Sequence, residues 1–175
     1  MAAQAAPMCS RVDDASRSTW RMRCHSRRTT LTDDYEFGRS LGDTHRLALL
    51  DEGLEFDIAL AGDRADEPPP GLAELRTLLA DRLVHDGHAR LDDYRRLLRR
   101  SDVVVSTAHH EFFGIAILEA VRCATFPILP RRLSYPELIP AAAHDDCLYD
   151  THDDLVARLR WALTSRKETR RLALR

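Results

Sequence analysis

The segment that constrains the fold most is Asp102–Ser106, in which three consecutive valines stand between polar residues. β-Branched residues favour strands, and a strand that is apolar without alternation is expected to be buried on both faces of a sheet. The loop Ser106–Gly114 leads from it into the almost wholly apolar stretch Ile115–Ala124, for which we expect a helix. Thr125–Leu129 then predicts another strand, ended by Pro130. Such a strand–helix–strand unit predicts two parallel strands joined by a right-handed crossover.

The same alternation of strand and helix patterns continues on both sides of this unit. Upstream, the patterns predict a strand at Phe56–Ala61, a helix at Gly71–Asp81, a strand at Leu83–His85 and a helix at Leu91–Arg100. Downstream, they predict a short edge strand within Cys147–Tyr149 and a last helix from about Asp153 to Leu163. We therefore expect an α/β fold with a doubly wound, Rossmann-like parallel sheet.

The two ends of the chain differ in composition from this middle part. Residues 1–32 are rich in Ser, Thr and Arg and have few large apolar side chains, so we expect a loosely structured arm. From Asp33 to Glu52, apolar residues recur at roughly helical spacing, and Gly53 is placed to end that helix. A chain of 175 residues, 44% of them hydrophobic, can form one good core. We expect one domain at 33–165, followed by a tail at 166–175.

Composition argues against several functional classes. The net charge of −2, from 26 basic and 28 acidic residues, gives no overall field that attracts nucleic acid or anionic membranes. No apolar run reaches the length of about 20 residues that crosses a membrane, and the start lacks the apolar run of a signal peptide. The four cysteines form no CxxC pair, as expected of reduced thiols. We expect a soluble, cytoplasmic protein without a membrane partner, and no oligomeric state is indicated.

The loop after Asp102–Ser106 is the strongest candidate for a binding site. In parallel α/β sheets, ligands bind beyond the carboxyl ends of the strands, where loops lead into helix N-termini. The first amides of such a helix have no partner within it, and with the helix dipole they can hold phosphate or sugar oxygens. Gly114 allows the backbone to approach a ligand closely.

Two glutamates belong to this segment. Glu119 is the only charged residue between Ile115 and Val121, so its carboxylate needs hydrogen-bond donors, which the vicinal hydroxyls of a ribose can supply. An ion pair with an arginine such as Arg122 is the alternative. Glu111, in turn, is either a ligand-binding group or a negative charge that stabilises the helix N-terminus.

Together these residues resemble a known family. Glu111-Phe-Phe-Gly-Ile-Ala-Ile-Leu-Glu119 is similar to the paired-glutamate motif, Glu-x7-Glu, in the C-terminal donor domain of GT-B retaining glycosyltransferases. The segment as a whole resembles the tRNA-queuosine α-mannosyltransferase family, with Ser-Thr-Ala-His-His before the first glutamate and Leu-Glu-Ala-Val-Arg-Cys around the second. Pro130-Arg-Arg-Leu-Ser-Tyr-Pro-Glu-Leu-Ile-Pro140 continues the similarity, which extends over about residues 56–163.

The resemblance implies a role for each residue of the site. It implies that the donor sugar is bound by Glu111, Phe112, Phe113 and His110, the diphosphate by Gly114, Ile115 and Arg23, and the ribose by Glu119. Arg23 is placed by a short match of Trp20-Arg-Met-Arg23 to a diphosphate-gripping loop of the family. The implied donor is GDP-mannose, and transfer retains the anomeric configuration, with the leaving diphosphate helping to deprotonate the incoming hydroxyl. Both glutamates are then binding groups, and no catalytic residue is assigned.

No metal and no cofactor are expected. The chain has no Asp-x-Asp, the element with which the other large glycosyltransferase fold holds its metal and the nucleotide diphosphate. His85-x-x-His88 and His109-His110 could suggest ligands, but neither pair has a carboxylate or cysteine cluster beside it.

Three hypotheses follow, because a GT-B enzyme has two Rossmann-like domains and this chain has room for one. The first is the donor domain of a retaining enzyme that acts on queuosine in tRNA, with an acceptor domain outside this chain. The second is a non-catalytic sugar-nucleotide-binding module that needs an acceptor-domain partner. The third is a structural Rossmann-like domain in which Glu111 and Glu119 form only ion pairs.

Overall fold

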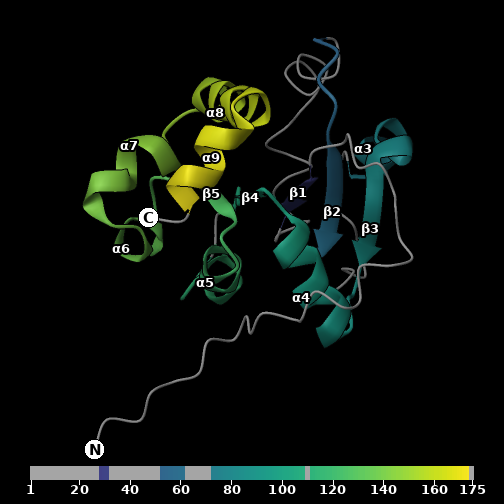
Figure 1. The fold of residues 1–175 in the computed structure, drawn as a ribbon, viewed down its shortest axis with the longest axis horizontal. Helices are drawn as coiled ribbons and strands as arrows, with labels where there is room; N and C mark the ends of the chain where they lie inside the picture. Colours follow the sequence, from purple (N-terminus) through teal and green to yellow (C-terminus); the bar gives the residue numbers. More distant parts are fainter. Residues whose placement is uncertain (1–27, 32–51, 62–71, 109–110, 174–175) are drawn as a thin grey trace, which may run out of the picture.

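The computed structural model describes residues 28–31, 52–61, 72–108 and 111–173. Within these ranges the chain forms a parallel sheet with the strand order β3-β2-β1-β4-β5-β6 (Figure 1). The strands are β1 (Arg28–Leu31), β2 (Asp57–Ala61), β3 (Leu83–Gly87), β4 (Val103–Val105), β5 (Phe126–Pro130) and β6 (Leu148–Tyr149). The α-helices are α3 (Leu72–Leu78), α4 (Leu91–Arg100), α5 (Ile115–Arg122), α6 (Tyr135–Leu138), α7 (His144–Cys147), α8 (His152–Thr164) and α9 (Arg166–Ala173), and the 3-10 turns are η2 (Ala80–Arg82) and η3 (Ala141–Ala143).

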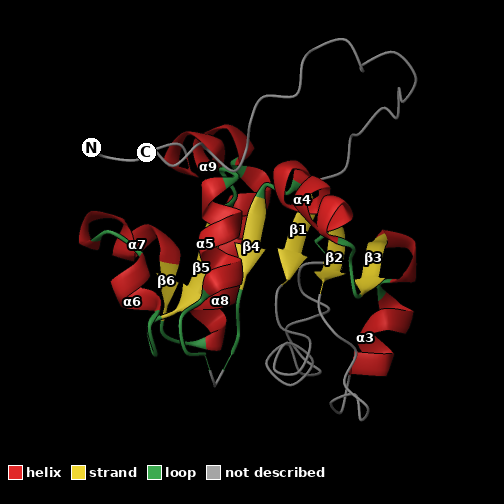
Figure 2. Ribbon diagram, turned by 90° about the horizontal axis from the view of Figure 1, so that it is seen from below, coloured by secondary structure: helices red, strands yellow, loops and turns green. Residues whose placement is uncertain are grey.

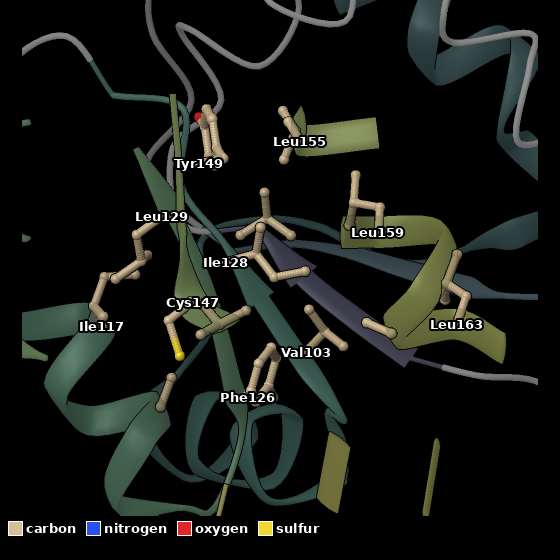
Figure 3. Packing of buried hydrophobic residues seen from close by; sticks show 14 of the residues in the cluster. Val103, Ile117, Phe126, Ile128, Leu129, Cys147, Tyr149, Leu155, Leu159 and Leu163 are labelled. Atoms are coloured by element: carbon tan, nitrogen blue, oxygen red, sulfur yellow. The ribbon is translucent and has the colours of Figure 1, made fainter. Parts of the chain in front are cut away.

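Helices cover both faces of this sheet. α4 and α5 lie on one face, and α8 and α9 lie on the other (Figure 1, Figure 2). Figure 3 shows Leu155, Leu159 and Leu163 of α8 on the side of the strands that carries Val103 and Ile128. From β1 the chain adds β2 and β3 toward one edge, and from β4 it adds β5 and β6 toward the other. The boundary between β1 and β4 is therefore the topological switch point, where folds of this class bind ligands.

The buried strands hold the loops that follow them in fixed positions. Val103, Val104 and Val105 are at most 2% exposed, and every residue of β5 is buried. Phe126 of β5 contacts Trp161 of α8 edge to face, with ring centroids 5.6 Å apart. Burying one such apolar side chain stabilises the fold by roughly 1.5–3 kcal/mol. The carboxyl ends of β4 and β5 therefore form a rigid edge.

Most of the predicted elements are confirmed, and with them the α/β, Rossmann-like fold. α4 has the predicted bounds, and β4, α5, β5, β6 and α8 begin and end within two residues of theirs. The helix predicted at Gly71–Asp81 is instead α3 followed by the turn η2, and β3 continues past His85 to Gly87. The helix predicted at 33–52 lies outside the described residues, except for its last position. None of the described helices has the length and apolar character to span a membrane.

The described parts of both ends depart from the prediction, while residues 1–27 of the predicted arm lie outside the described residues. Arg28–Leu31, expected within a loosely structured arm at 1–32, forms β1 at the centre of the sheet, paired with β2 and β4. Pairing on both edges outweighs the weak local preference of this short segment, and a sequence pattern does not reveal such long-range pairing. The tail expected at 166–175 contains α9, whose Arg166 and Arg170 form ion pairs of 3.2 and 3.3 Å with the buried Asp102. The described fold therefore includes 28–31 and 166–173.

Candidate functional site

The loop after β4 is held by side chains from segments that follow β5. Ser106 Oγ and Tyr135 Oη share a hydrogen bond of 2.7 Å, and Tyr149 Oη donates to the Ser106 carbonyl at 2.9 Å. Arg132 donates to two backbone carbonyls of the loop, at 2.9 and 3.1 Å. Burial raises the pKa of Tyr149, so its hydroxyl keeps its proton and stays a donor. Ser106 and Thr107 are at most 2% exposed, so this part of the loop is buried and held in a fixed position beside the site.

Glu111 binds the amides that precede α5. Its Oε1 accepts hydrogen bonds from the backbone amides of Phe112, Phe113 and Gly114, at 2.9, 3.2 and 2.9 Å. The carboxylate thus occupies amides that the resemblance assigns to sugar and diphosphate oxygens. A negative charge at a helix N-terminus is favourable by about 0.3–1 kcal/mol. The loop therefore forms an anion-binding turn that a side chain of the protein itself fills.

Gly114 is required here by conformation and by space. Its φ is 65°, in the left-handed region that L side chains rarely adopt. A Cβ atom at this position would lie 2.6 Å from Cδ1 of Leu138 and 3.6 Å from Cε1 of Tyr135. α6 therefore lies directly against the start of α5 and closes one side of the loop.

The two phenylalanines of the loop present their rings to solvent. Phe112 is 89% exposed and Phe113 is 74% exposed, and Ile115 and Leu118 of α5 add 64% and 41% exposed side chains nearby in the sequence. Exposed apolar side chains grouped in this way are typical of a surface that another molecule covers. The amides of Phe112 and Phe113 are held by Glu111, so these residues offer their exposed rings to a partner molecule.

Glu119 faces α4. Its Oε2 accepts a hydrogen bond of 3.0 Å from Tyr94 Oη, and burial and this carboxylate both raise the pKa of Tyr94, so the tyrosine stays a donor. Among the described residues Glu119 forms no ion pair, so the alternative of a pair with Arg122 is not realised. Glu119 and Arg122 line a cavity of about 140 Å³ between α4 and α5. The other residues that line it are Leu91, Tyr94, Arg95, Leu98 and Cys123.

Three residues of the site, Tyr94, Arg132 and Thr107, were not predicted from the sequence. Tyr94 lies within the predicted helix Leu91–Arg100, and only its hydrogen bond to Glu119 shows that the hydroxyl is used. Thr107 Oγ1 is buried and has no hydrogen-bond partner in the described part of the chain, although buried hydroxyls normally have one. Its place directly after the predicted strand Asp102–Ser106 was a signal available in the sequence.

The remaining predicted site residues are placed as follows. His110, expected at the sugar, and Arg23, expected at the diphosphate, lie outside the described residues. Nε2 of His85 is 2.9 Å from the Gly87 carbonyl oxygen and so serves the end of β3. Across the ranges that the structure describes, no group of three or more His, Cys, Asp or Glu side chains is arranged to hold a metal ion.

Comparison with known proteins decides the family. Residues 49–174 match the family model described as glycosyl transferases group 1. The chain belongs to this family. The match includes Glu111, Glu119 and every described element except β1.

One curated relative of this group 1 glycosyltransferase has a more narrowly defined name than the family model. The tRNA-queuosine alpha-mannosyltransferase of Drosophila melanogaster is 37% identical over 106 residues, which are 61% of this chain and 27% of the relative. The chain thus spans about a quarter of the length of that relative. The resemblance seen in the sequence to this family is therefore confirmed.

Solved structures show the same fold. The catalytic domain of cholesterol-alpha-glucosyltransferase from Helicobacter pylori superposes with a TM-score of 0.59 at 16% identity, covering 84% of this chain and 92% of that chain. Sucrose-phosphate synthase from Thermosynechococcus elongatus superposes with a TM-score of 0.63 at 17% identity, covering 85% of this chain and 39% of that chain. These likenesses identify the group 1 chain as one Rossmann-like half of a GT-B fold.

Proposed function

We propose that this chain is the donor-binding domain of a retaining glycosyltransferase, which binds GDP-mannose for transfer to queuosine in tRNA. Family membership supports sugar transfer as the general chemistry, and the 37% identity to the queuosine mannosyltransferase supports mannose as the sugar and queuosine as the acceptor. GDP as the nucleotide is a prediction of the resemblance. We also propose that the protein acts in the cytoplasm, which suits Cys123 and Cys147 because neither forms a disulfide in the structure.

The position of Glu119 is the observation that carries this proposal. Its carboxylate lies on the second turn of α5, and one oxygen is held by Tyr94. The other oxygen has no hydrogen bond within the described part of the chain, so it can accept from the vicinal hydroxyls of a ribose. The amides at the start of α5 lack partners in the helix and suit a diphosphate one turn away. One nucleotide can therefore reach both groups.

In this proposal the diphosphate and the sugar use neighbouring parts of the loop. Glu111 stays on its three amides, and the remaining lone pairs of its carboxylate accept hydroxyls of the donor sugar. The amide of Ile115, with Gly114 beside it, faces the diphosphate at the first turn of α5. The sugar contact of His110 and the diphosphate contact of Arg23 stay predictions of the resemblance.

The chemistry follows from stabilising the leaving group. Amides and positive charge beside the diphosphate lower the free energy of the transition state in which the sugar–phosphate bond breaks. The released phosphate oxygen then takes the proton of the incoming hydroxyl. We propose no metal ion and no cofactor for this step, and the two glutamates bind rather than exchange protons.

A non-catalytic sugar-nucleotide-binding module is the alternative. The chain covers 27% of its curated relative, so an acceptor domain would have to come from elsewhere. The exposed rings of Phe112 and Phe113, next to the site, suit a surface that such a partner covers. This alternative predicts donor binding by the isolated chain and transfer only after the partner is added.

Calorimetric titration with GDP and with GDP-mannose tests the donor site. We expect saturable binding of both, weakened at least roughly tenfold by Glu119→Ala, which removes the acceptor of the ribose hydroxyls. Glu111→Ala should remove the advantage of GDP-mannose over GDP. Glu55→Ala, an exposed glutamate just before β2, is the matched control and should bind both normally. Absence of saturable GDP binding to the wild-type chain would sink the proposal.

A transfer assay separates the enzyme from the binding module. The reaction contains the chain, GDP-mannose and tRNA that carries queuosine, and the product is followed by mass spectrometry of the nucleosides. Mannosylated queuosine formed by the isolated chain supports the enzyme. GDP-mannose binding without product supports the module, and restoration of product by a supplied acceptor domain identifies the missing half.

A further inference from the structure

A second cavity lies on the side of α4 that faces away from α5. It has a volume of about 330 Å³ and forms an open groove between α4 and the edge strand β3. Asp93, Arg96 and Arg100 line it from α4, at the three- and four-residue spacing that places side chains on one helix face. Val84 lines it from β3. α4 therefore separates this groove from the cavity that contains Glu119.

The groove is basic, although the chain as a whole is not. Arg90, Arg96 and Arg100 contribute three positive charges and Asp93 one negative charge, against a net charge of −2 for the whole sequence. Arg96 pairs with Asp93, but their side chains are 64% and 49% exposed, and such pairs contribute only about 0–1 kcal/mol. In the described ranges no ion pair involves Arg90 or Arg100. A phosphate can therefore compete for these guanidinium groups.

The floor of the groove is apolar. Leu97 is half-buried there, and Val84 of β3 is 44% exposed. Within the described sheet β3 has only β2 as a neighbour, and Val84 and His85 of β3 line the groove opposite α4. Basic walls over an apolar floor suit a nucleic-acid strand, whose phosphates contact arginines while riboses and bases lie on apolar side chains.

The direction of the groove links it to the donor site. Arg90 is the N-cap of α4 and follows the carboxyl end of β3 by three residues. Arg100 ends α4 three residues before the amino end of β4. The groove therefore runs along the height of the sheet and reaches the carboxyl edge on which Glu111 and Glu119 lie.

We propose that this groove binds the phosphate backbone of the acceptor RNA and leads it toward the carboxyl edge of the sheet. The inference rests on the proposed function, since that function makes an RNA the acceptor. It assigns part of the RNA recognition to this domain, in addition to any acceptor domain. The ligand chemistry is a run of phosphodiesters, because the groove offers several guanidinium groups in a row rather than one enclosed anion pocket.

Two adjacent arginines supply a matched test. Arg99 and Arg100 are both exposed at the end of α4, but only Arg100 lines the groove. The purified chain is titrated into a fluorescently labelled tRNA transcript, and anisotropy is recorded at several salt concentrations. We expect Arg100→Glu to weaken binding roughly fivefold or more and to lower the salt slope by about 1 unit. Arg99→Glu, with the same charge change, should alter affinity less than about twofold.

The outcomes that overturn the inference are distinct from a failure of donor binding. Equal losses for Arg99→Glu and Arg100→Glu would mean diffuse attraction to the helix, and no binding of tRNA by the wild-type chain at low salt would remove the inference altogether. Equal affinity for poly-glutamate would identify an acidic protein as the ligand. Displacement of tRNA by GDP would assign the groove to the donor site. Donor binding is tested separately by the GDP titration, which Arg100→Glu should leave unchanged.

Discussion

Tyr94 Oη lies 3.0 Å from Oε2 of Glu119 and joins α4 to α5 at the candidate ribose site. Tyr94→Phe removes the hydroxyl and keeps the ring, so we expect GDP affinity to fall about tenfold through a less well positioned carboxylate. A double-mutant cycle measured by calorimetry checks this: Tyr94→Phe should have no further effect in a Glu119→Ala background. Additive losses would mean that Tyr94 acts independently of Glu119.

Gly114 should tolerate no side chain, and Gly53 supplies the comparison. Both have left-handed φ, 65° and 68°, but an added Cβ at Gly53 meets nothing within 4 Å, whereas at Gly114 it meets Leu138 at 2.6 Å. We expect Gly53→Ala to cost about 1–2 kcal/mol of unfolding free energy from strain alone, and Gly114→Ala to cost more. Urea denaturation measures both. Combining Gly114→Ala with Leu138→Ala should recover the part of the unfolding free energy that is lost through the contact with Leu138. Equal losses for Gly53→Ala and Gly114→Ala would contradict a steric effect of Leu138.

Asp102 should anchor α9 to the start of β4. The buried carboxylate pairs with Arg166 and Arg170, both of which remain partly exposed. Asp102→Asn removes the charge at nearly constant shape, and we expect a loss of about 1 kcal/mol and faster amide exchange in residues 166–173. Hydrogen exchange with mass spectrometry localises the change. Glu168→Gln, which breaks a pair with Arg171 within α9 itself, is the control and should leave the docking of α9 intact.

Cys147 should be inert in the folded protein. Burial, with a smaller effect of Asp146, raises the pKa of its thiol to about 12, so almost none is thiolate at pH 8. Because the folded pKa exceeds the unfolded one, this thiol favours the folded state fully below about pH 8.5, and the contribution is lost as pH rises toward 12. Peptide mass spectrometry after iodoacetamide treatment should find Cys147 unmodified at pH 8 and modified in urea. Half-buried Cys123 is the internal comparison, and native labelling of Cys147 at the unfolded rate would refute the prediction.

The Glu111–Glu119 segment could be located from sequence because its signals are local. Three valines, a glycine and an apolar helix with one carboxylate specify a buried strand, a tight loop and a helix N-terminus within 20 residues or so. The contact of Glu119 with Tyr94 could not be predicted in the same way. It depends on how α4 is rotated against α5, and packing across two crossovers sets that rotation rather than any motif.

The hydrogen bonds between Glu111 and the loop amides could likewise not be predicted from the sequence. The sequence allows Glu111 to be either a ligand-binding group or a charge at the helix N-terminus, and in the structure its carboxylate accepts from three amides. The short segment Arg28–Leu31 and the helix α9 were missed for a related reason. Their stability comes from β2, β4 and Asp102, partners that are remote in sequence, while their own composition is polar.

The central position of β1 sets a limit on how the protein can be shortened. Recombinant expression of a fragment that starts at Asp33, the boundary that composition suggests, would remove the strand that joins β2–β3 to β4–β5–β6. β2 and β4 would then each present an unpaired edge, and exposed edges of apolar strands are templates for aggregation. A soluble fragment of this glycosyltransferase domain therefore has to begin upstream of Arg28, and a preparation cut by protease between β1 and β2 should keep the strand bound.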